Sequence, residues 1–296
     1  SLGPVPETHM LKPYDKRVDA TYKYMLVNLQ NLDKDYKKIK QLRFENLKQY
    51  QAGKKYGIRW KIDSTKYSTM DFKGYEGKYK PSEISGKPRL FYDRNKPFTK
   101  KIKLFTTAVP TGYIIIPKYY VIPQSQYRVI EEFRRNKIQM KSLRKDSTIA
   151  VESYKIDDFK TVKNPYEGHY LHFETAVDKS NKNLVFSAGD YLVPTSQEGV
   201  KYIIETLEPE ALDSFFNWNF FDGILAQKEY YSAYIFEDTA AELLKKDKDL
   251  KQKFEAKKSS DKNFADDGKA QLDWIYKNSP YFEEKTFRQY PIYRIL

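Results

Sequence analysis

The first residues that could do chemistry are a carboxylate, a hydroxyl and an imidazole at three successive positions. Glu7, Thr8 and His9 lie in the stretch VPETHMLKPYDKRV, and a proline and a long segment with helical periodicity follow them directly. The start of an ordinary domain is more often polar and dispensable. We therefore interpret Glu7 as a candidate catalytic residue that ends an active-site strand, with His9 as a neighbour that could orient its carboxylate.

Metal chemistry is limited by the three histidines of the chain, because a catalytic zinc usually takes three protein ligands. His169 and His172 are an odd number of positions apart in a predicted strand, so they point to opposite faces. His172 and Glu174 share a face, but a third ligand would have to come from a distant segment. We therefore favour an ordinary polar strand face over a metal site. The chain contains no HExxH or HxxE motif.

Other catalytic signatures are also missing from the sequence. There is no cysteine, which excludes disulfides, thiolate metal sites and cysteine nucleophiles. No GxSxG elbow, GxxxxGK[ST] loop or GxGxxG fingerprint occurs. The segment LDSFFNWNFFDGIL (212–225) is rich in aromatic residues, which could bind sugars, peptides or bases. Because it lies between predicted helices, we interpret it as core rather than as a binding surface.

Composition and charge restrict the class of protein. The chain has 296 residues, enough for about two domains of ~150 residues each, and 40% of its residues are hydrophobic. The net charge is +13, but the lysines are scattered among acids, and the run KDKDLKQKFEAKK (246–258) alternates in sign. Such a run is typical of a solvated helix face, so we expect no nucleic-acid partner. Proline and lysine interrupt the longest apolar stretches, so we also expect no membrane span.

The elements that must position these residues follow from the hydrophobic periodicity. From Tyr14 onward, apolar residues recur at spacings of three and four, which predicts one helix that ends before Gly53 and that could kink near 31–33. From about 56 to 193, alternating apolar residues and turn signals predict strands, interrupted by a helix at 125–137 with Tyr127, Ile130 and Phe133 on one side.

The last third of the chain returns to helical spacing. Thr195 and Glu198 stand at the spacing of a capping box and predict a helix start there. Helical patterns continue to Pro280, and YPIYRIL is predicted to be a terminal strand or a docked tail. We therefore expect an α+β protein with a long N-terminal helix, a β-rich middle (an antiparallel sheet or sandwich) and a helical C-terminal subdomain. The expected boundaries are 1–52, 53–194 and 195–296.

Both ends of the chain resemble a known family. ETHMLKPYDKRVDATYKYM is similar to the end of the catalytic domain in zinc carboxypeptidases of the carboxypeptidase A type, where a strand delivers a glutamate and a final helix follows. The stretches GDYLVPTSQ, TLEPEALDSFFNWNFFD, QKEYYSAYIFEDTAAELL and QLDWIYKNSPYFEEKTFRQYPIYRIL resemble the C-terminal extension of a bacterial branch of those enzymes. The resemblance implies that residues 1–52 close a carboxypeptidase domain and that the remainder is an accessory region.

The resemblance assigns only one site residue. Glu7 would be the general base and acid, and zinc would belong to the parent enzyme, whose ligands precede this glutamate. We therefore expect no cofactor in this chain and no activity from the chain alone. The implied partners are an upstream peptidase domain and a peptide substrate, and the implied location is periplasmic or secreted. The alternative is a non-catalytic accessory module that binds peptide or glycan.

Overall fold

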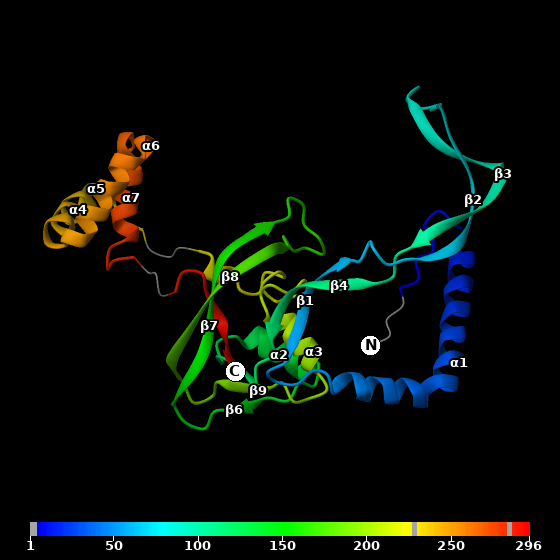
Figure 1. Cartoon of the computed structure of the whole chain (residues 1–296), viewed down its shortest axis with the longest axis horizontal. Coiled ribbons are helices and arrows are strands. Elements are labelled where there is room, and N and C mark those ends of the chain that lie inside the picture. The colour runs from blue at the N-terminus through cyan, green and yellow to red at the C-terminus, as the bar shows by residue number, and fades with distance from the viewer. Residues whose placement is uncertain (1–4, 227–229, 283–285) are drawn as a thin grey trace. The chain divides into compact units, whose positions relative to one another are not determined.

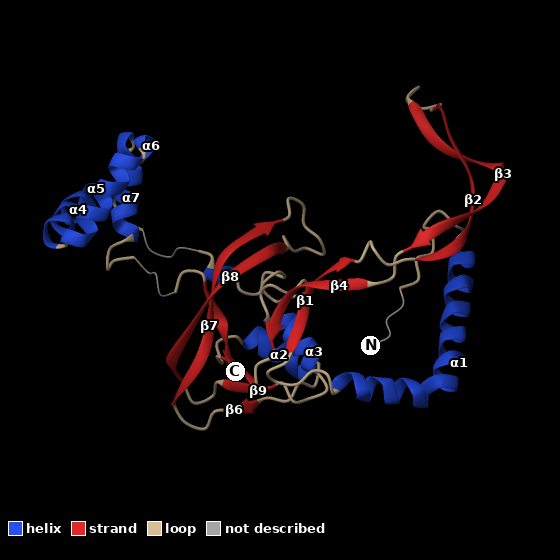
Figure 2. Cartoon of the chain, in the orientation of Figure 1, coloured by secondary structure: helices blue, strands red, loops and turns tan. Residues whose placement is uncertain are grey.

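The computed structural model describes residues 5–226, 230–282 and 286–296, and it divides into two compact units. The first unit comprises residues 1–54 and 115–296, and the second comprises residues 55–114. Figure 1 and Figure 2 show a long N-terminal helix, antiparallel sheets and a group of C-terminal helices. The α+β class expected from the sequence is confirmed. Among the described residues, none of the helices combines the length and apolar composition that a membrane crossing requires.

The N-terminal helix α1 spans Tyr14–Leu47, close to the predicted range, and Pro13 occupies its N-cap position. Its apolar residues form one stripe, as the periodicity predicts, but none of its residues is buried in the structure. Figure 1 shows the helix bent rather than straight, in agreement with the predicted kink. The segment 14–47 contains no proline or glycine, so neither residue causes the bend.

The central element of the first unit is a six-stranded sheet in the order β6-β9-β5-β10-β7-β8. Every neighbouring pair of its strands is antiparallel. The strands are β5 (Tyr119–Ile122), β6 (Lys141–Ser142), β7 (Ser147–Thr161), β8 (His172–Phe186), β9 (Tyr191–Pro194) and β10 (Gln289–Ile295). The predicted terminal strand is therefore confirmed as β10, and it lies in the interior of the sheet between β5 and β7. The last residues of the chain thus share a sheet with its middle region.

Two helices supply most of the remaining core on one face of this sheet. Helix α2 (Tyr127–Arg135) buries Val129, Ile130 and Phe133, whereas Tyr127 is exposed, contrary to the predicted face. Helix α3 (Val200–Leu207) begins after Gly199, so the predicted capping box is wrong. The hydroxyl of Thr195 instead donates to the carbonyl of Pro117, 2.6 Å away, and therefore joins the strand region rather than the helix.

The aromatic segment 212–225 completes this core, as the sequence interpretation expected. Phe215, Phe216 and Phe221 are buried and belong to the same cluster as Tyr120 and Tyr290. The short 3-10 helix Asp222–Ile224 ends the segment. Trp218 is only partly buried, so one aromatic residue of the segment reaches the surface. Core packing therefore explains most, but not all, of this aromatic composition.

The C-terminal helices α4 (Ala233–Lys246), α5 (Lys248–Ser260), α6 (Lys262–Asp266) and α7 (Gly268–Lys277) form their own apolar cluster. Three aspartates separate them at Asp247, Asp261 and Asp267. Each carboxylate accepts a hydrogen bond from the backbone N–H three residues later, at 2.9, 3.1 and 3.0 Å. These are N-cap contacts, each of which satisfies one unpaired donor at a helix start. They explain how a highly charged segment divides into short helices.

The second unit consists of two antiparallel strand pairs. Strands β1 (Lys55–Ile62) and β4 (Ala108–Ile115) form one two-stranded sheet. Strands β2 (Ser68–Pro81) and β3 (Pro88–Leu104) form a long hairpin, and their register shifts between Tyr75 and Glu76. Both strands of the hairpin consist of exposed and partly exposed residues. The hairpin therefore has no core of its own.

A buried ion pair connects the strands at the centre of the six-stranded sheet to the chain that follows α3. Glu208 is 1% exposed and Arg294 is 3% exposed, and Nε of Arg294 lies 3.0 Å from Oε1 of Glu208. The hydroxyl of Tyr120 donates to the same carboxylate oxygen at 2.5 Å. Arg294 also contacts Glu152 and the hydroxyl of Tyr154. The two charges are thus surrounded by polar partners from β5, β7 and β10.

The environment of this pair shifts the pKa values of its members. Burial raises the pKa of the Glu208 carboxyl, and the guanidinium of Arg294 opposes that shift. Burial, the largest single influence, would lower the pKa of Arg294, but Glu208 together with Tyr154, Tyr120 and Glu152 raises that pKa overall. Burial likewise raises the pKa of Tyr154. The 3.0 Å contact between Nε of Arg294 and Oε1 of Glu208 makes these two buried groups each other's partner of opposite sign.

We expect Arg294→Met to destabilise the protein by about 3–5 kcal/mol, because it leaves the Glu208 carboxylate buried without a cation. The double variant Glu208→Gln/Arg294→Met should be more stable than Arg294→Met alone. Urea denaturation measures the free energy of unfolding of both variants. As a control, Lys246→Gln removes an exposed pair with Glu242 and should leave the denaturation midpoint unchanged. Equal stability of Arg294→Met and the natural chain would contradict a structural role for the pair.

Candidate functional site

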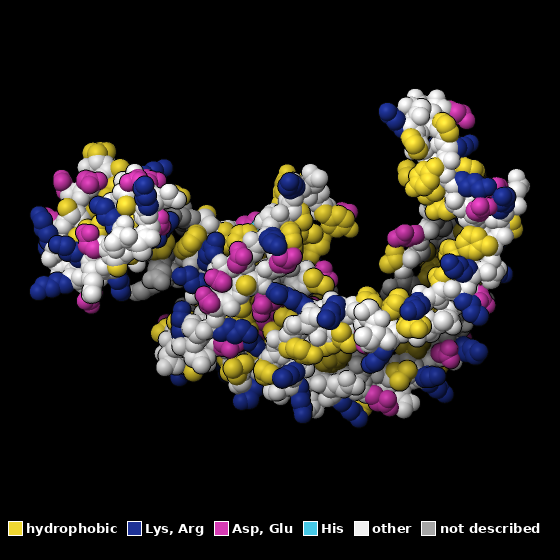
Figure 3. All heavy atoms as spheres, turned by 45° about the horizontal axis from the view of Figure 1, so that its top comes forward, with side chains coloured by type: hydrophobic (Ala, Val, Ile, Leu, Met, Phe, Trp, Pro, Cys, Tyr) yellow, Lys and Arg dark blue, Asp and Glu magenta, His cyan; other side chains and the backbone are white. Residues whose placement is uncertain are grey.

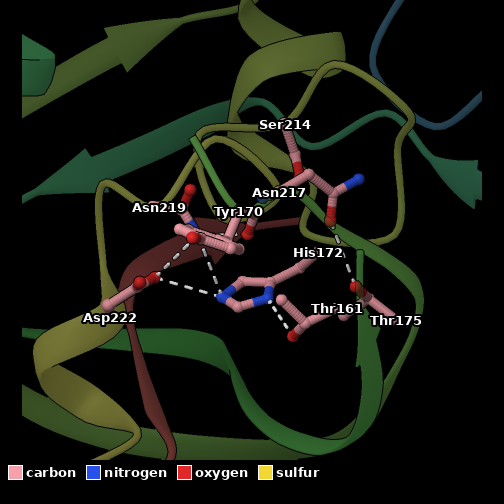
Figure 4. Close-up of polar contacts among 8 residues, drawn as sticks. All are labelled: Thr161, Tyr170, His172, Thr175, Ser214, Asn217, Asn219 and Asp222. Atoms are coloured by element: carbon pink, nitrogen blue, oxygen red, sulfur yellow. Dashed lines mark hydrogen bonds and ion pairs between the residues drawn. The ribbon is translucent and has the colours of Figure 1, made fainter. Parts of the chain in front are cut away.

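The described residues place a polar cluster at the end of the β7–β8 pair, where the segment 208–222 crosses it (Figure 4). The backbone N–H of His172 donates to the carbonyl of Asn217 at 2.9 Å, which attaches β8 to that segment. Asn217 also receives a hydrogen bond from the hydroxyl of Thr175, with 3.2 Å between Oγ1 and Oδ1. Strand β8 and the crossing segment therefore hold this end of the sheet together.

His172 is the centre of the cluster and is 6% exposed. Its Nε2 lies 3.1 Å from Oδ1 of Asp222, and its Nδ1 lies 2.9 Å from Oγ1 of Thr161. Because a carboxylate only accepts, the contact with Asp222 is a hydrogen bond when Nε2 carries the proton, and the Thr161 hydroxyl can then donate to Nδ1. The rings of Phe159 and Phe216 flank the imidazole, with centroids at 4.7 and 5.0 Å. The amide nitrogen of Asn219 also lies 3.3 Å from Nε2. The imidazole is therefore fixed in orientation by three polar and two aromatic neighbours.

A β-bulge brings His172 and Thr175 to the same side of β8. The register runs from Lys160 opposite Phe173 to Asp158 opposite Ala176, so β8 has one residue more than β7 in this interval. Glu174 adopts a φ of 51°, in the left-handed region that such a bulge uses. Both His172 and Thr175 are consequently buried, and Glu174 is exposed. The carboxylate of Glu174 instead pairs with Lys160.

The sequence expectation that His172 and Glu174 share a face is therefore wrong, because it assumed unbroken alternation along the strand. We also expected His172 to lie on an ordinary polar strand face, but its ring is buried. Among the described residues, no three His, Asp or Glu side chains lie close enough to hold a metal ion. The described side chains around His172 therefore do not supply the ligands of a zinc site.

Aromatic residues lie next to the cluster, and we name them the rim: Tyr166, His169, Tyr170 and Trp218. Tyr166 and His169 exchange two backbone hydrogen bonds of 2.9 Å, which closes a tight two-residue turn. Glu167 and Gly168 between them have φ values of 49° and 79°, as a type I′ turn requires. The turn places both rings near Trp218, with centroid distances of 6.3 Å from Tyr166 and 5.5 Å from His169.

Local contacts also fix the crossing segment 208–222, where Asn219 meets the backbone of Tyr170. Asn219 has a φ of 64°, and its side-chain amide donates to the carbonyl of Tyr170 at 2.9 Å. Its side-chain oxygen is buried and has no hydrogen-bond partner. The rings of Tyr166 and Tyr170 are 60% and 53% exposed. The rim thus presents aromatic rings to solvent on a backbone that local contacts fix.

The cluster can position groups but offers no nucleophile beside the imidazole. The hydroxyl of Ser214 accepts from the backbone N–H of Asn217 and lies 3.3 Å from the carbonyl of Pro209. The Thr175 hydroxyl contacts Asn217 and the Thr161 hydroxyl contacts His172. A histidine that activates a hydroxyl must hold it within hydrogen-bond reach while a third group orients the ring. Here Thr161 and Asp222 occupy both ring nitrogens, so the arrangement favours binding or structure over nucleophilic catalysis.

The predicted catalytic residue Glu7 belongs to no helix or strand in the structure. Glu7 is exposed, and the described residues 5–9 form no strand, which corrects the expectation of an active-site strand. A strand needs a hydrogen-bonded neighbour, and Pro6 additionally lacks a donor. His9 does not orient Glu7 in the structure, since its Nδ1 accepts from the backbone N–H of Leu11 at 3.2 Å. The catalytic role of Glu7 itself stays a prediction.

Sequence reasoning missed the buried Glu208–Arg294 pair. The signal was present, because Glu208 follows the apolar run of α3 and Arg294 interrupts the apolar YPIYRIL stretch. A single charged residue within an apolar run indicates a buried partner of opposite sign. Comparison with known protein families, curated proteins and solved structures finds no match. The function must therefore be argued from the residues of the chain.

We expect Gly168→Ala to lower the free energy of unfolding by about 1 kcal/mol, because an L-residue is strained at a φ of 79°. Gly223→Ala is the matched control. An added Cβ meets no atom within 4 Å at either glycine, but the backbone at Gly223 is not in the left-handed region. Urea denaturation should show a loss only for Gly168→Ala. Equal effects of both variants would contradict a rigid turn at the rim.

Proposed function

We propose that this chain is the C-terminal portion of a zinc-dependent metallocarboxypeptidase, in which α1 packs against a peptidase domain and the sheet unit is an accessory region. The observation that carries the proposal is the unpartnered apolar stripe of α1. Its apolar side chains are between 43% and 74% exposed at Tyr14, Val18, Tyr22, Met25, Leu29, Leu32 and Tyr36. A surface helix normally turns such a stripe toward a core.

The stripe has the dimensions of a packing surface rather than of scattered surface residues. Apolar positions recur over a helix of 34 residues, which is about 50 Å long at 1.5 Å per residue. Two hollows of about 340 and 480 Å³ lie along it, the first lined by residues 14–25 and the second mainly by residues 32–47. Exposed apolar surfaces of this extent mark interaction sites. A partner polypeptide would remove the stripe from water.

Glu7 lies seven residues before the start of α1, where the family resemblance puts the catalytic glutamate. In the proposal its carboxylate takes a proton from the attacking water and passes it to the leaving amine. Within the part of the chain that the structure describes, no three His, Asp or Glu side chains lie close enough to hold a metal ion. In the proposal, the metal ligands and the groups that bind the substrate carboxylate therefore belong to the peptidase domain. The chain alone should then be inactive.

The chain alone, supplied with zinc, is expected to release no amino acid from the C-terminus of peptide substrates. Produced as one protein with the coding sequence that precedes Ser1, it should show hydrolysis that a chelator abolishes. Glu7→Gln should then lower kcat by about 10²–10⁴-fold with little change in KM, because it removes the general base. Glu83→Gln, at another exposed glutamate, is the control.

Two results would contradict this proposal. Chelator-sensitive turnover by the 296-residue chain alone would show that its own residues bind the metal. A longer protein with full activity after Glu7→Gln would remove the role of Glu7. An HxxE motif about a hundred or more residues before Glu7 in the gene would support the family assignment independently of activity.

A second candidate is a non-catalytic accessory module that binds peptide or glycan at the aromatic rim. The observation that favours it is the fixed presentation of Tyr166, His169 and Trp218 beside the unpaired side-chain oxygen of Asn219. Aromatic faces bind the apolar faces of sugar rings and of peptide side chains, and a fixed backbone lowers the entropy cost of binding.

Calorimetry of the full chain with peptides and with neutral oligosaccharides tests this candidate. If the rim binds either, Trp218→Ala should weaken binding by about tenfold, because a stacked ring contributes on the order of 1 kcal/mol or more. Trp60→Ala, at a half-exposed tryptophan in the other unit, is the control. Absence of heat with both ligand types would exclude the module and leave the peptidase proposal unaffected.

A further inference from the structure

The positive charge of the chain is concentrated in the second unit. Residues 55–114 contain 14 lysine and arginine residues and five aspartate and glutamate residues. The remaining residues contain 39 basic and 35 acidic side chains. The expectation of scattered lysines therefore holds for most of the sequence but not for this unit. A local excess of one sign over so short a segment creates a potential that attracts polymers of the opposite sign.

Most of this charge lies on the β2–β3 hairpin, which Figure 1 shows as a long twisted ribbon. Ten of the 14 basic residues fall within 68–104, against four acidic residues. Few of the basic groups are paired: Lys101 contacts Asp71 at 3.0 Å, and Lys78 and Lys96 contact Glu76 at 3.7 and 3.4 Å. These pairs are exposed and contribute little. With ten basic and four acidic residues, the hairpin thus carries an excess of six positive charges.

The register shows that one face of the ribbon combines cations with tyrosines. Thr69 lies opposite Lys103, Asp71 opposite Lys101, Gly77 opposite Tyr92, and Tyr79 opposite Leu90. Directly opposed residues project to the same face, and alternate residues of one strand do so as well. This face also carries Asp71, which pairs with Lys101 at 3.0 Å. We name it the lysine–tyrosine face after six of its side chains: Lys73, Lys101, Lys103, Tyr75, Tyr79 and Tyr92.

The tyrosines of this face are open to solvent. Tyr75, Tyr79 and Tyr92 are 46%, 74% and 63% exposed. Gly77 leaves space between them, since a Cβ there would lie 3.5 Å from the ring of Tyr92. At the upper right of Figure 3, where the β2–β3 hairpin is drawn, hydrophobic side chains and Lys or Arg side chains lie next to each other. A ring with one open face and a phenol hydroxyl can both stack and hydrogen-bond.

We propose that the lysine–tyrosine face binds an acidic polysaccharide. Side chains on one face of a strand repeat every ~6.7 Å, so successive lysines can meet successive charges of an extended polymer. Lysine outnumbers arginine by eight to two in the hairpin, and compact ammonium groups suit isolated carboxylates or sulfates. Bidentate contact to guanine is the commonest base-specific contact, and the fork of arginine suits it best, so a hairpin with only two arginines favours a glycan over base-specific recognition.

The test measures binding of the full chain to polygalacturonate by calorimetry over a series of NaCl concentrations, with neutral dextran and single-stranded DNA as comparisons. Polygalacturonate should bind, and its affinity should fall steeply with salt, because bound lysines release counterions as they do on nucleic acids. Dextran should not bind. This proposal does not depend on the peptidase activity, which the same protein sample can lack without affecting the result.

Three variants locate the surface. Lys73→Gln/Lys101→Gln/Lys103→Gln should weaken binding by about tenfold or more and flatten the salt dependence by roughly two to three units of slope. Lys248→Gln/Lys251→Gln/Lys253→Gln removes the same charge from α5 and should change affinity less than about twofold. Tyr79→Ser/Tyr92→Ser should weaken binding by about fivefold and leave the salt slope unchanged, because it removes stacking rather than charge.

Several results would overturn the proposal. Equal losses in the two triple variants would show that net charge, and not this face, drives binding. Tighter binding of single-stranded DNA than of polygalacturonate at the same salt concentration would assign the face to nucleic acid. Binding of dextran as strong as that of polygalacturonate, or no binding of polygalacturonate at all, would exclude a charge-directed glycan surface. Circular dichroism of each variant checks that the ribbon is retained.

Discussion

The ion pair between Glu208 and Arg294 is the interaction on which the first unit depends. Taking two charges out of water costs several kcal/mol each, and only close geometry with further hydrogen bonds compensates for that cost. Here Tyr120 donates to the carboxylate, and Glu152 and Tyr154 contact the guanidinium. Because these partners come from β5, β7 and the chain after α3, the pair can be satisfied only when β10 lies between β5 and β7. The cost of burying charge thereby selects one position and register for that strand.

Much of the secondary structure could be predicted from the sequence because it depends on nearby residues. The spacing of apolar residues predicts α1 and α2, and the turn residues predict the strands. The failures have long-range or backbone causes. Thr195 donates to the carbonyl of Pro117, 78 residues away in sequence, and so cannot act as a helix cap. The interior position of β10 could not be predicted, since strand order depends on contacts between distant segments.

In the candidate site, too, features that depend on nearby residues could be predicted and those with backbone or long-range causes could not. The sequence singles out His172 and Glu174, but the extra residue in β8 sends the second outward and the first into the core. A bulge has no reliable local signature unless it contains glycine, and this one contains Glu174 at a φ of 51°. For α1 the local prediction holds, because the helix forms as predicted, but its apolar stripe has no partner among the described residues. The unpartnered stripe and the lysine–tyrosine face differ in chemistry, since the first is apolar and the second is mainly cationic.

The interior position of β10 also determines how this protein can fold. One hydrogen bond between Gln289 and the backbone of Tyr154 spans 135 residues of the chain, so the sheet has a high contact order and should form slowly. While β10 is still being synthesised at about 5–20 residues per second, β5 and β7 both have an open edge. Open edges pair readily with other chains. Newly made copies would therefore be most prone to aggregate in the interval before the last strand inserts, and a chaperone that covers strand edges would act in that interval.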